Sequence, residues 1–227
     1  MKILVISDAH GNTENIEKLA DKFGEADMVL FAGDFAEFKR PETAKPTLES
    51  ILKRHECIFS VIGNCDDPSF LSEIENADIS VEKSLVFHEG LAIAGCGGGT
   101  KFTGETLFER TEEEIMSDFQ IVTNSAEQCA DENGHWSNLV LIMHNPPKDT
   151  KCDMLPNGVH VGSELLRKFI ETNSPLLVVT GHIHEAVGID TIGTTTIINP
   201  GSLAEGRYGW VELDDSLKVK TAELFTL

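Results

Sequence analysis

The chain contains 227 residues, of which 41% are hydrophobic and 25% are charged, an ordinary balance for a globular protein with a sizeable core. Its 18 basic and 38 acidic residues give a formal net charge of −20, and a surface of this sign repels nucleic acids and anionic membranes. No apolar run approaches the ~18 residues of a membrane span, and the N-terminal apolar stretch is too short for a signal peptide. We therefore expect one domain over residues 1–227 in a cytoplasmic protein.

The five cysteines are odd in number, and no two of them are spaced C-x-x-C. This usage argues against a disulfide framework and against a thiolate zinc site. We expect most of the cysteines to be small buried residues. No feature of the composition predicts an oligomeric state.

Apolar runs and helical spacings alternate along most of the chain and predict strands followed by helices. In the first half we expect a strand at Ile3–Ser7, a helix over 16–23 that ends at Gly24, a strand at Met28–Ala32, a helix over 48–52 after Pro46, a strand at Ile58–Ile62 and a hairpin of Leu85–Phe87 with Leu91–Ala94. In the second half we expect a helix over 115–129 with a Thr111–Glu114 capping box, a strand at Leu139–Met143, a helix over 161–169 that stops before Pro175 and a strand at Leu176–Thr180.

The end of the chain has a different pattern, which predicts antiparallel strands at Ala186–Ile189, Thr194–Ile198, Trp210–Leu213 and Leu217–Leu224. Strand–helix alternation indicates an α/β architecture, and the antiparallel segments favour a mixed sheet or two packed sheets. The longest apparent loop, Cys96–Leu107, contains three consecutive glycines. It either folds over a site or forms a plain turn.

A polar cluster follows each of the five continuous apolar strands. The clusters are Asp8-Ala9-His10-Gly11-Asn12, Gly33-Asp34, Gly63-Asn64-Cys65-Asp66, His144-Asn145-Pro146 and Gly181-His182-Ile183-His184. Because the carboxyl ends of parallel strands share one edge of a sheet, we expect these clusters to converge. Asp, His and Asn donate oxygen and nitrogen lone pairs suited to Mn²⁺, Fe²⁺ or Zn²⁺. Seven donor side chains drawn from the five clusters would be more than one tetrahedral ion needs. Two ions that share a carboxylate would use all seven.

Each cluster taken alone has an ordinary explanation. An Asp after a strand is commonly a helix N-cap, a buried His is commonly a hydrogen-bonded core residue, and an Asn after Gly is commonly in a turn. Five such clusters at five strand ends are hard to attribute to chance. The other four histidines, His55, His88, His135 and His160, follow no core strand, and we expect them to be structural.

The ordered set Asp-x-His, Gly-Asp, Gly-Asn-x-Asp, His and Gly-His-x-His resembles the calcineurin-like metallophosphoesterase superfamily, from Asp8 to the Asn199-Pro200-Gly201-Ser202 turn. The resemblance implies a layered sandwich of two mixed β-sheets flanked by α-helices. It implies two divalent ions, with Mn²⁺ expected first and Fe²⁺, Zn²⁺, Ni²⁺ or Co²⁺ as alternatives. One ion would be held by Asp8, His10, Asp34 and His184, and the other by Asp34, Asn64, His144 and His182.

The activity that the resemblance implies is hydrolysis of a small phosphate ester, in particular a phosphodiester, by a hydroxide that bridges the two ions. Many family members have His after Gly-Asn, where it is thought to protonate the leaving group. Cys65 occupies that position here, as in a branch of small phosphodiesterases that the sequence resembles. A thiol has an unperturbed pKa of ~8.5 and donates hydrogen bonds weakly. Cys65 is therefore either a catalytic residue, together with Asn64 and Asp66, or a partly buried filler.

The remaining site residues are expected near the centre. Asp66 is a candidate to orient a neighbouring imidazole. Asn12 either supports the first metal loop or contacts the substrate phosphate, and Lys101 and Arg110 are candidates to contact the substrate. The competing function is a non-catalytic scaffold, because one subunit of the retromer coat has a similar fold with an impaired metal set. Every ligand position is occupied in this sequence, which favours an enzyme. The metallo-β-lactamase pattern and the Walker A motif are both absent.

Overall fold

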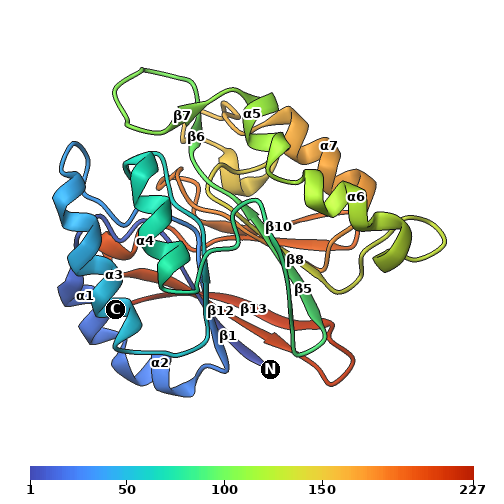
Figure 1. Cartoon of the computed structure of the whole chain (residues 1–227), viewed down its shortest axis with the longest axis horizontal. Helices are drawn as coiled ribbons and strands as arrows, with labels where there is room; N and C mark the ends of the chain where they lie inside the picture. Colours follow the sequence, from blue (N-terminus) through green and yellow to red (C-terminus); the bar gives the residue numbers. More distant parts are fainter.

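Two β-sheets packed face to face form the centre of the computed structural model, which describes residues 1–227 (Figure 1). In the first sheet three parallel strands are continued by two antiparallel ones, in the order β13-β12-β1-β2-β3. Its strands are β1 (Lys2–Ile6), β2 (Met28–Phe31), β3 (Ile58–Ser60), β12 (Arg207–Leu213) and β13 (Val219–Thr226).

The second sheet has the order β10-β11-β9-β8-β5-β4, and only its two edge strands run antiparallel to their neighbours. Its strands are β4 (Leu85–His88), β5 (Leu91–Cys96), β8 (Leu139–Met143), β9 (Leu177–Val179), β10 (Gly188–Ile192) and β11 (Thr195–Asn199). A short parallel pair, β6 (Gly99–Thr100) with β7 (Glu109–Arg110), stands apart from both sheets. Both large sheets are mixed, which confirms the predicted fold class.

The inner strands β2, β5, β8 and β9 are buried and apolar along their whole length, because both faces of the sheet are covered at these strands. In β1, Ile3 and Val5 pack against the second sheet, whereas Leu4 and Ile6 pack against helices. Successive side chains of a strand point to opposite faces, so a strand between two apolar layers needs apolar residues at every position.

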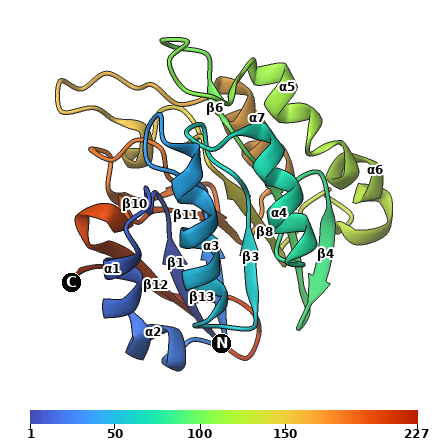
Figure 2. The ribbon, with the colours of Figure 1, turned by 60° about the vertical axis from the view of Figure 1, so that its left-hand side comes forward.

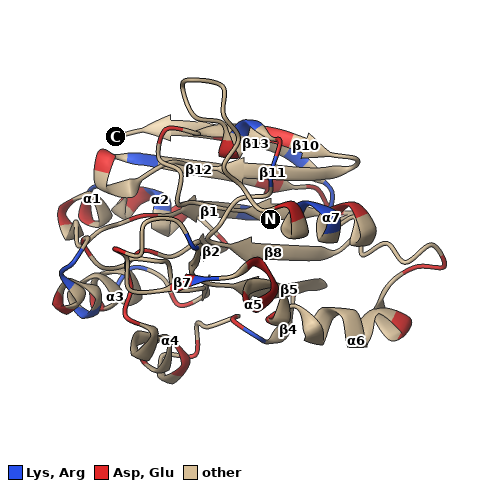
Figure 3. Ribbon diagram, turned by 90° about the horizontal axis from the view of Figure 1, so that it is seen from above, with Lys and Arg blue, Asp and Glu red and all other residues tan.

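Helices cover the outer face of each sheet (Figure 2). The first sheet is covered by α1 (Thr13–Lys18), α2 (Ala20–Glu25), α3 (Ala44–Leu52) and α4 (Leu71–Asn76), and the second by α5 (Glu112–Ser117), α6 (Gln120–Cys129) and α7 (Glu164–Asn173). Acidic residues occur on helices of both outer layers (Figure 3). None of these helices has the length and apolar character that crossing a lipid bilayer requires.

The helix predicted over 16–23 is two helices, and its predicted end is wrong. The helix is interrupted at Leu19, whose N–H donates to the carbonyls of both Asn15 and Ile16. Gly24 lies inside α2, and the helix ends at Glu25. The apolar stripe is nevertheless buried on one face, because the break is a single residue long.

The helix predicted over 115–129 is also divided, at residues 118 and 119. Its capping box is confirmed, since the Thr111 hydroxyl accepts the Glu114 N–H and the Glu114 carboxylate accepts the Thr111 N–H. Pro46 lies within the first turn of α3 rather than before it. The first four N–H groups of a helix have no partner in the helix, so a proline costs little there.

Candidate metal centre

All five polar clusters meet at one edge of the two sheets, around an open cavity of about 370 Å³. Five of the seven predicted ligands line this cavity: His10, Asp34, Asn64, His182 and His184. Asp8 and His144 are fully buried and contact these residues. The predicted convergence of strand ends therefore brings all seven side chains together.

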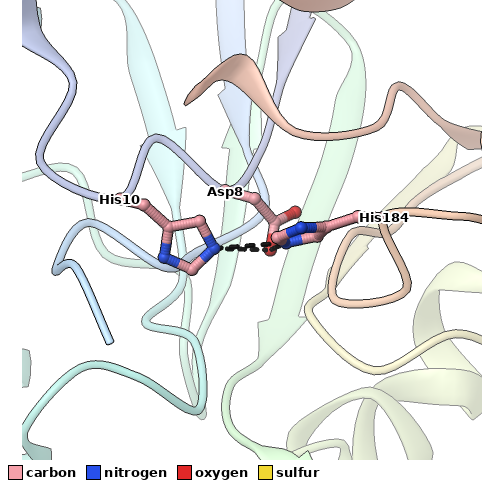
Figure 4. A group of neighbouring side chains, drawn as sticks. All are labelled: Asp8, His10 and His184. Atoms are coloured by element: carbon pink, nitrogen blue, oxygen red, sulfur yellow. Dashed lines mark hydrogen bonds and ion pairs between the residues drawn. The ribbon is translucent and has the colours of Figure 1, made fainter. Parts of the chain in front are cut away.

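The first group of donors consists of Asp8, His10 and His184, whose side chains point toward one another (Figure 4). The Nε2 atom of His184 lies 3.2 Å from Asp8 Oδ1 and 3.2 Å from Nε2 of His10. The other ring nitrogen of His10, Nδ1, lies 2.9 Å from the Ala36 carbonyl. A neutral imidazole that donates from Nδ1 presents a lone pair at Nε2, so lone pairs converge here as they do around a cation.

The second group lies around His144. Its Nδ1 atom is 2.6 Å from the Ala32 carbonyl, which again directs Nε2 toward the centre. That Nε2 lies 2.7 Å from Asn64 Oδ1 and 3.5 Å from Asp34 Oδ2. The His182 ring lies beside that of His144, with the ring centroids 5.1 Å apart.

Asp34 lies between the two groups. Its Oδ2 atom is 3.5 Å from His144 Nε2 in one group and 3.7 Å from His10 Nε2 in the other. The donor atoms of Asp8, Asp34 and His144 all fall within 4.8 Å of one another. Oxygen and nitrogen donors in two groups joined by one carboxylate fit a pair of divalent cations.

Four of these side chains are attached to strained backbone. Asp8, His10, Asp34 and His182 have φ values of 53°, 44°, 59° and 67°, in the left-handed region that non-glycine residues rarely adopt. Such conformations cost roughly 1–3 kcal/mol each and cluster at functional sites. The sharp turns aim successive side chains inward.

Two glycines allow the buried carboxylates to lie against neighbouring loops. A Cβ atom at Gly63 would overlap Asp34 Oδ1, and one at Gly181 would overlap the Ser7 hydroxyl and lie 2.5 Å from Asp8 Oδ2. All three contacts would be shorter than real Cβ atoms tolerate. Because glycine has no Cβ atom, Gly63 and Gly181 permit this close approach of the backbone.

Asp66 binds backbone N–H groups and does not orient a neighbouring imidazole, which was its predicted role. Its carboxylate accepts the backbone N–H groups of Phe35, Ala36 and Gly63 at 3.2, 2.7 and 2.8 Å, and no imidazole is among its partners. Burial and the neighbouring Asp34 raise its pKa to about 7. Asp66 joins the loop that follows β2 to the loop that follows β3, and so positions both Asp34 and Asn64.

Cys65 lines the cavity and is 6% exposed. Its N–H donates to Asp34 Oδ1 at 2.8 Å, so its backbone orients the carboxylate between the two groups. Burial and the charge of Asp34 raise the pKa of the thiol far above its usual range. The Sγ atom also lies within 4.8 Å of donor atoms of His10 and Asp34, a proximity that the sequence analysis did not anticipate.

The three predicted substrate contacts have different surroundings. Lys101 is exposed and lines a cavity next to the centre. Asn12 is the N-cap of α1, accepting the Asn15 N–H and donating to the Ala204 carbonyl. Arg110 is 7% exposed, and its guanidinium binds the Asp118 carboxylate at 2.5 and 2.8 Å. Because their polar groups are engaged within the protein, Asn12 and Arg110 support the loops, and we retain Lys101 alone as a candidate substrate contact.

The calcineurin-like phosphoesterase model matches residues 1–186, which contain all seven donors. The chain belongs to the calcineurin-like phosphoesterase family. Members of this family act on phosphate esters with the help of divalent metal ions. The structure of this calcineurin-like phosphoesterase thus has donor groups of the kind that its family requires.

Related proteins extend over almost the whole chain. An uncharacterized protein of Methanocaldococcus jannaschii is 30% identical over 95% of this chain and 96% of its own length. A UPF0046 protein of Caenorhabditis elegans is 27% identical over 91% of this chain and 71% of its own length. The crystal structure of TT1561 from Thermus thermophilus superposes with a TM-score of 0.72 and 21% identity, covering 99% of this chain and 98% of the other, and it shows the same fold.

The ionisable groups of this phosphoesterase shift one another strongly. Burial alone would lower the pKa of His184, but its hydrogen bond to Asp8 and the charge of that carboxylate raise it to about 9. Burial alone would raise the pKa of Asp8, but the hydrogen bond from His184 and the charge of His144 lower it. His182 has a pKa lowered to about 4 by burial and by the neighbouring His144. Their surroundings therefore shift the pKa values of His184 and His182 in opposite directions.

Metal affinity is expected to fall as the pH falls, starting below about pH 9, the pKa of His184. A cation must displace the proton of His184, so its affinity decreases about tenfold for each pH unit below that value. Calorimetric titration with Mn²⁺ at pH 8.5, 7.5 and 6.5 measures this slope. Equal affinities at the three pH values would show that carboxylates alone bind the metal.

Proposed function

We propose that this protein is a phosphodiesterase that depends on two divalent metal ions, with Mn²⁺ as the first candidate. The observation that carries the proposal is the position of Asp34, within 3.7 Å of a histidine of each donor group. We assign Asp8, His10, Asp34 and His184 to one ion, and Asp34, Asn64, His144 and His182 to the other. Both groups combine imidazole nitrogens with carboxylate or amide oxygens, a donor set that suits such ions.

Bound divalent ions polarise phosphoryl oxygens and lower the pKa of water, which supplies the nucleophile and the charge stabilisation that ester hydrolysis needs. The chain itself contributes placement. The Ala36 and Ala32 carbonyls orient His10 and His144, and Asp66 holds the two loops that carry Asp34 and Asn64. These outer contacts keep the lone pairs directed inward.

A diester is favoured over a monoester by the charges around the cavity. A monoester dianion needs more positive charge than a diester monoanion. Glu37 lines the metal cavity, and Lys39, the nearby cation, is paired with Glu105 at 3.1 Å. Lys101 is thus the cation left to meet a substrate in the adjoining cavity.

The first test is metal analysis combined with a substrate panel. After reconstitution with Mn²⁺, the protein should hold two ions per chain and hydrolyse bis(p-nitrophenyl) phosphate faster than p-nitrophenyl phosphate. A chain that binds metal but hydrolyses no ester would instead support the non-catalytic scaffold. The complete set of ligand positions favours the enzyme.

Cys65→Ala is expected to change kcat/KM for bis(p-nitrophenyl) phosphate by less than about threefold, because p-nitrophenolate leaves without protonation. Cys65→His is expected to raise the rate on alkyl esters, whose leaving groups need a proton, by up to ~10²-fold. The measurement is kcat/KM for wild type and both variants on diesters graded by leaving-group pKa. Loss of aryl diester hydrolysis in Cys65→Ala with intact metal content would show that the thiol is itself catalytic.

A further inference from the structure

A second cavity of about 400 Å³ opens beside the metal centre. Asn64 and His182 line both this cavity and the one over the predicted ligands, so the two cavities adjoin each other. Leu155, Val161 and Ile183 supply an apolar wall to the second cavity. Its size is in the range of cavities that bind small organic groups.

The loop between β6 and β7, which projects from the body of the protein (Figure 1), also lines this cavity. Phe102 on this loop lines the cavity although the residue is 92% exposed. An aromatic ring left in water at the rim of a cavity gains stability when a second apolar surface covers it. The exposed ring of Phe102 is therefore available to contact a ligand in this cavity.

Hydrogen bonds and one ion pair hold the loop that carries Phe102 in place. The Glu109 carboxylate accepts the N–H groups of Phe102 and Gly104 at 3.0 and 2.9 Å, and the Thr106 hydroxyl at 3.1 Å. Glu105 on the same loop pairs with Lys39 from the loop beside the metal cavity. These bonds hold the backbone of the loop that carries the ring before any ligand arrives, which reduces the entropy lost on binding.

We propose that this second cavity receives a flat aromatic substituent of the phosphate ester, held between Phe102 and the wall of Leu155 and Ile183. The inference rests on the proposed function, because the phosphate must lie at the metal centre for its substituent to reach Phe102. Phe102 is then a specificity-determining residue. An aryl group and a nucleobase offer the same flat π-face, and the two are separate arms of the test.

The test measures binding, so that it does not depend on turnover. Calorimetry with the manganese-loaded chain gives Kd values for methyl phosphate, phenyl phosphate and adenosine 5′-monophosphate. We expect at least one ring-bearing ligand to bind about tenfold more tightly than methyl phosphate. Phe102→Ala should reduce this preference to about twofold or less, and Phe102→Leu should reduce it partly. Neither variant should change the Kd of methyl phosphate.

The matched control is Phe87→Ala, which removes another exposed ring, 64% exposed, from the edge strand β4. It should keep the full preference. The proposal is overturned if wild type shows no preference for a ring or if Phe102→Ala retains it. Hydrolysis of bis(p-nitrophenyl) phosphate is measured on the same samples. Hydrolysis without a ring preference contradicts the cavity assignment alone, whereas a ring preference without hydrolysis contradicts the proposed phosphodiesterase and supports the cavity assignment.

Discussion

Replacing Asp34 by asparagine is expected to lower kcat/KM for a phosphodiester by about 10³-fold and to reduce manganese binding below two ions per chain. The substitution preserves shape, and asparagine tolerates the φ of 59° at this position. What it removes is the negative charge that the two donor groups share. Each metal ion contributes several kcal/mol to transition-state stabilisation, and 1.36 kcal/mol corresponds to a factor of ten in rate.

The control is Asp78→Asn, which makes the same change at an exposed residue with a φ of 57°. It should leave both metal content and activity unaltered. Elemental analysis and steady-state kinetics on the two variants and wild type separate the loss of charge from backbone effects. If Asp34→Asn still binds two ions per chain and keeps its activity, the assignment of Asp34 as a ligand of both ions is refuted.

Asp118→Ala is expected to destabilise the fold by about 4 kcal/mol, because it leaves the Arg110 guanidinium buried without its partner. The carboxylate side chain is fully buried and the Arg110 side chain is 9% exposed. Arg110 also donates to the Gly97 and Glu114 carbonyls, at 3.0 and 2.5 Å. Urea unfolding measures the change in free energy, and its midpoint should fall with the slope unchanged.

Glu73→Ala is the matched control, since it breaks an exposed ion pair with Lys45. It should cost less than ~1 kcal/mol, as exposed pairs do. The double variant Arg110→Met with Asp118→Leu should recover much of the lost stability, because it removes both buried charges. A loss below about 1 kcal/mol in Asp118→Ala would mean that water reaches the guanidinium.

The sequence by itself determined the layers of this protein and the edge at which its polar residues meet. Continuous apolar strands such as Leu139–Met143 have one stable environment, a sheet covered on both faces, and the strand predicted there is confirmed at the same residues. Parallel strands that end in Asp, Asn or His then bring those residues to a common edge. Whether a strand is buried on one face or on both is visible in the apolar pattern of its own residues, so the layers can be predicted from local sequence.

Helix boundaries were less predictable, because tertiary contacts compete with local propensity. The 115–129 stripe continues in one phase, and yet the helix is interrupted beside Asp118, whose carboxylate binds Arg110 of a preceding strand. The spacing of apolar residues contains no information about that partner. The same holds for Leu19, where one buried face persists across two helices.

The tertiary structure alone decided which polar residues face the centre. Arg110 and Lys101 are equivalent in the sequence as cations near a glycine-rich loop, but one is buried against Asp118 and the other is exposed at the second cavity. Asp66 binds three backbone N–H groups rather than an imidazole, because the loops that follow β2 and β3 come together there. The exposed ring of Phe102 is a candidate substrate contact only because it lines the same cavity as Asn64 and His182. A side chain's partners depend on distances between segments far apart in the chain, and no local pattern encodes those distances.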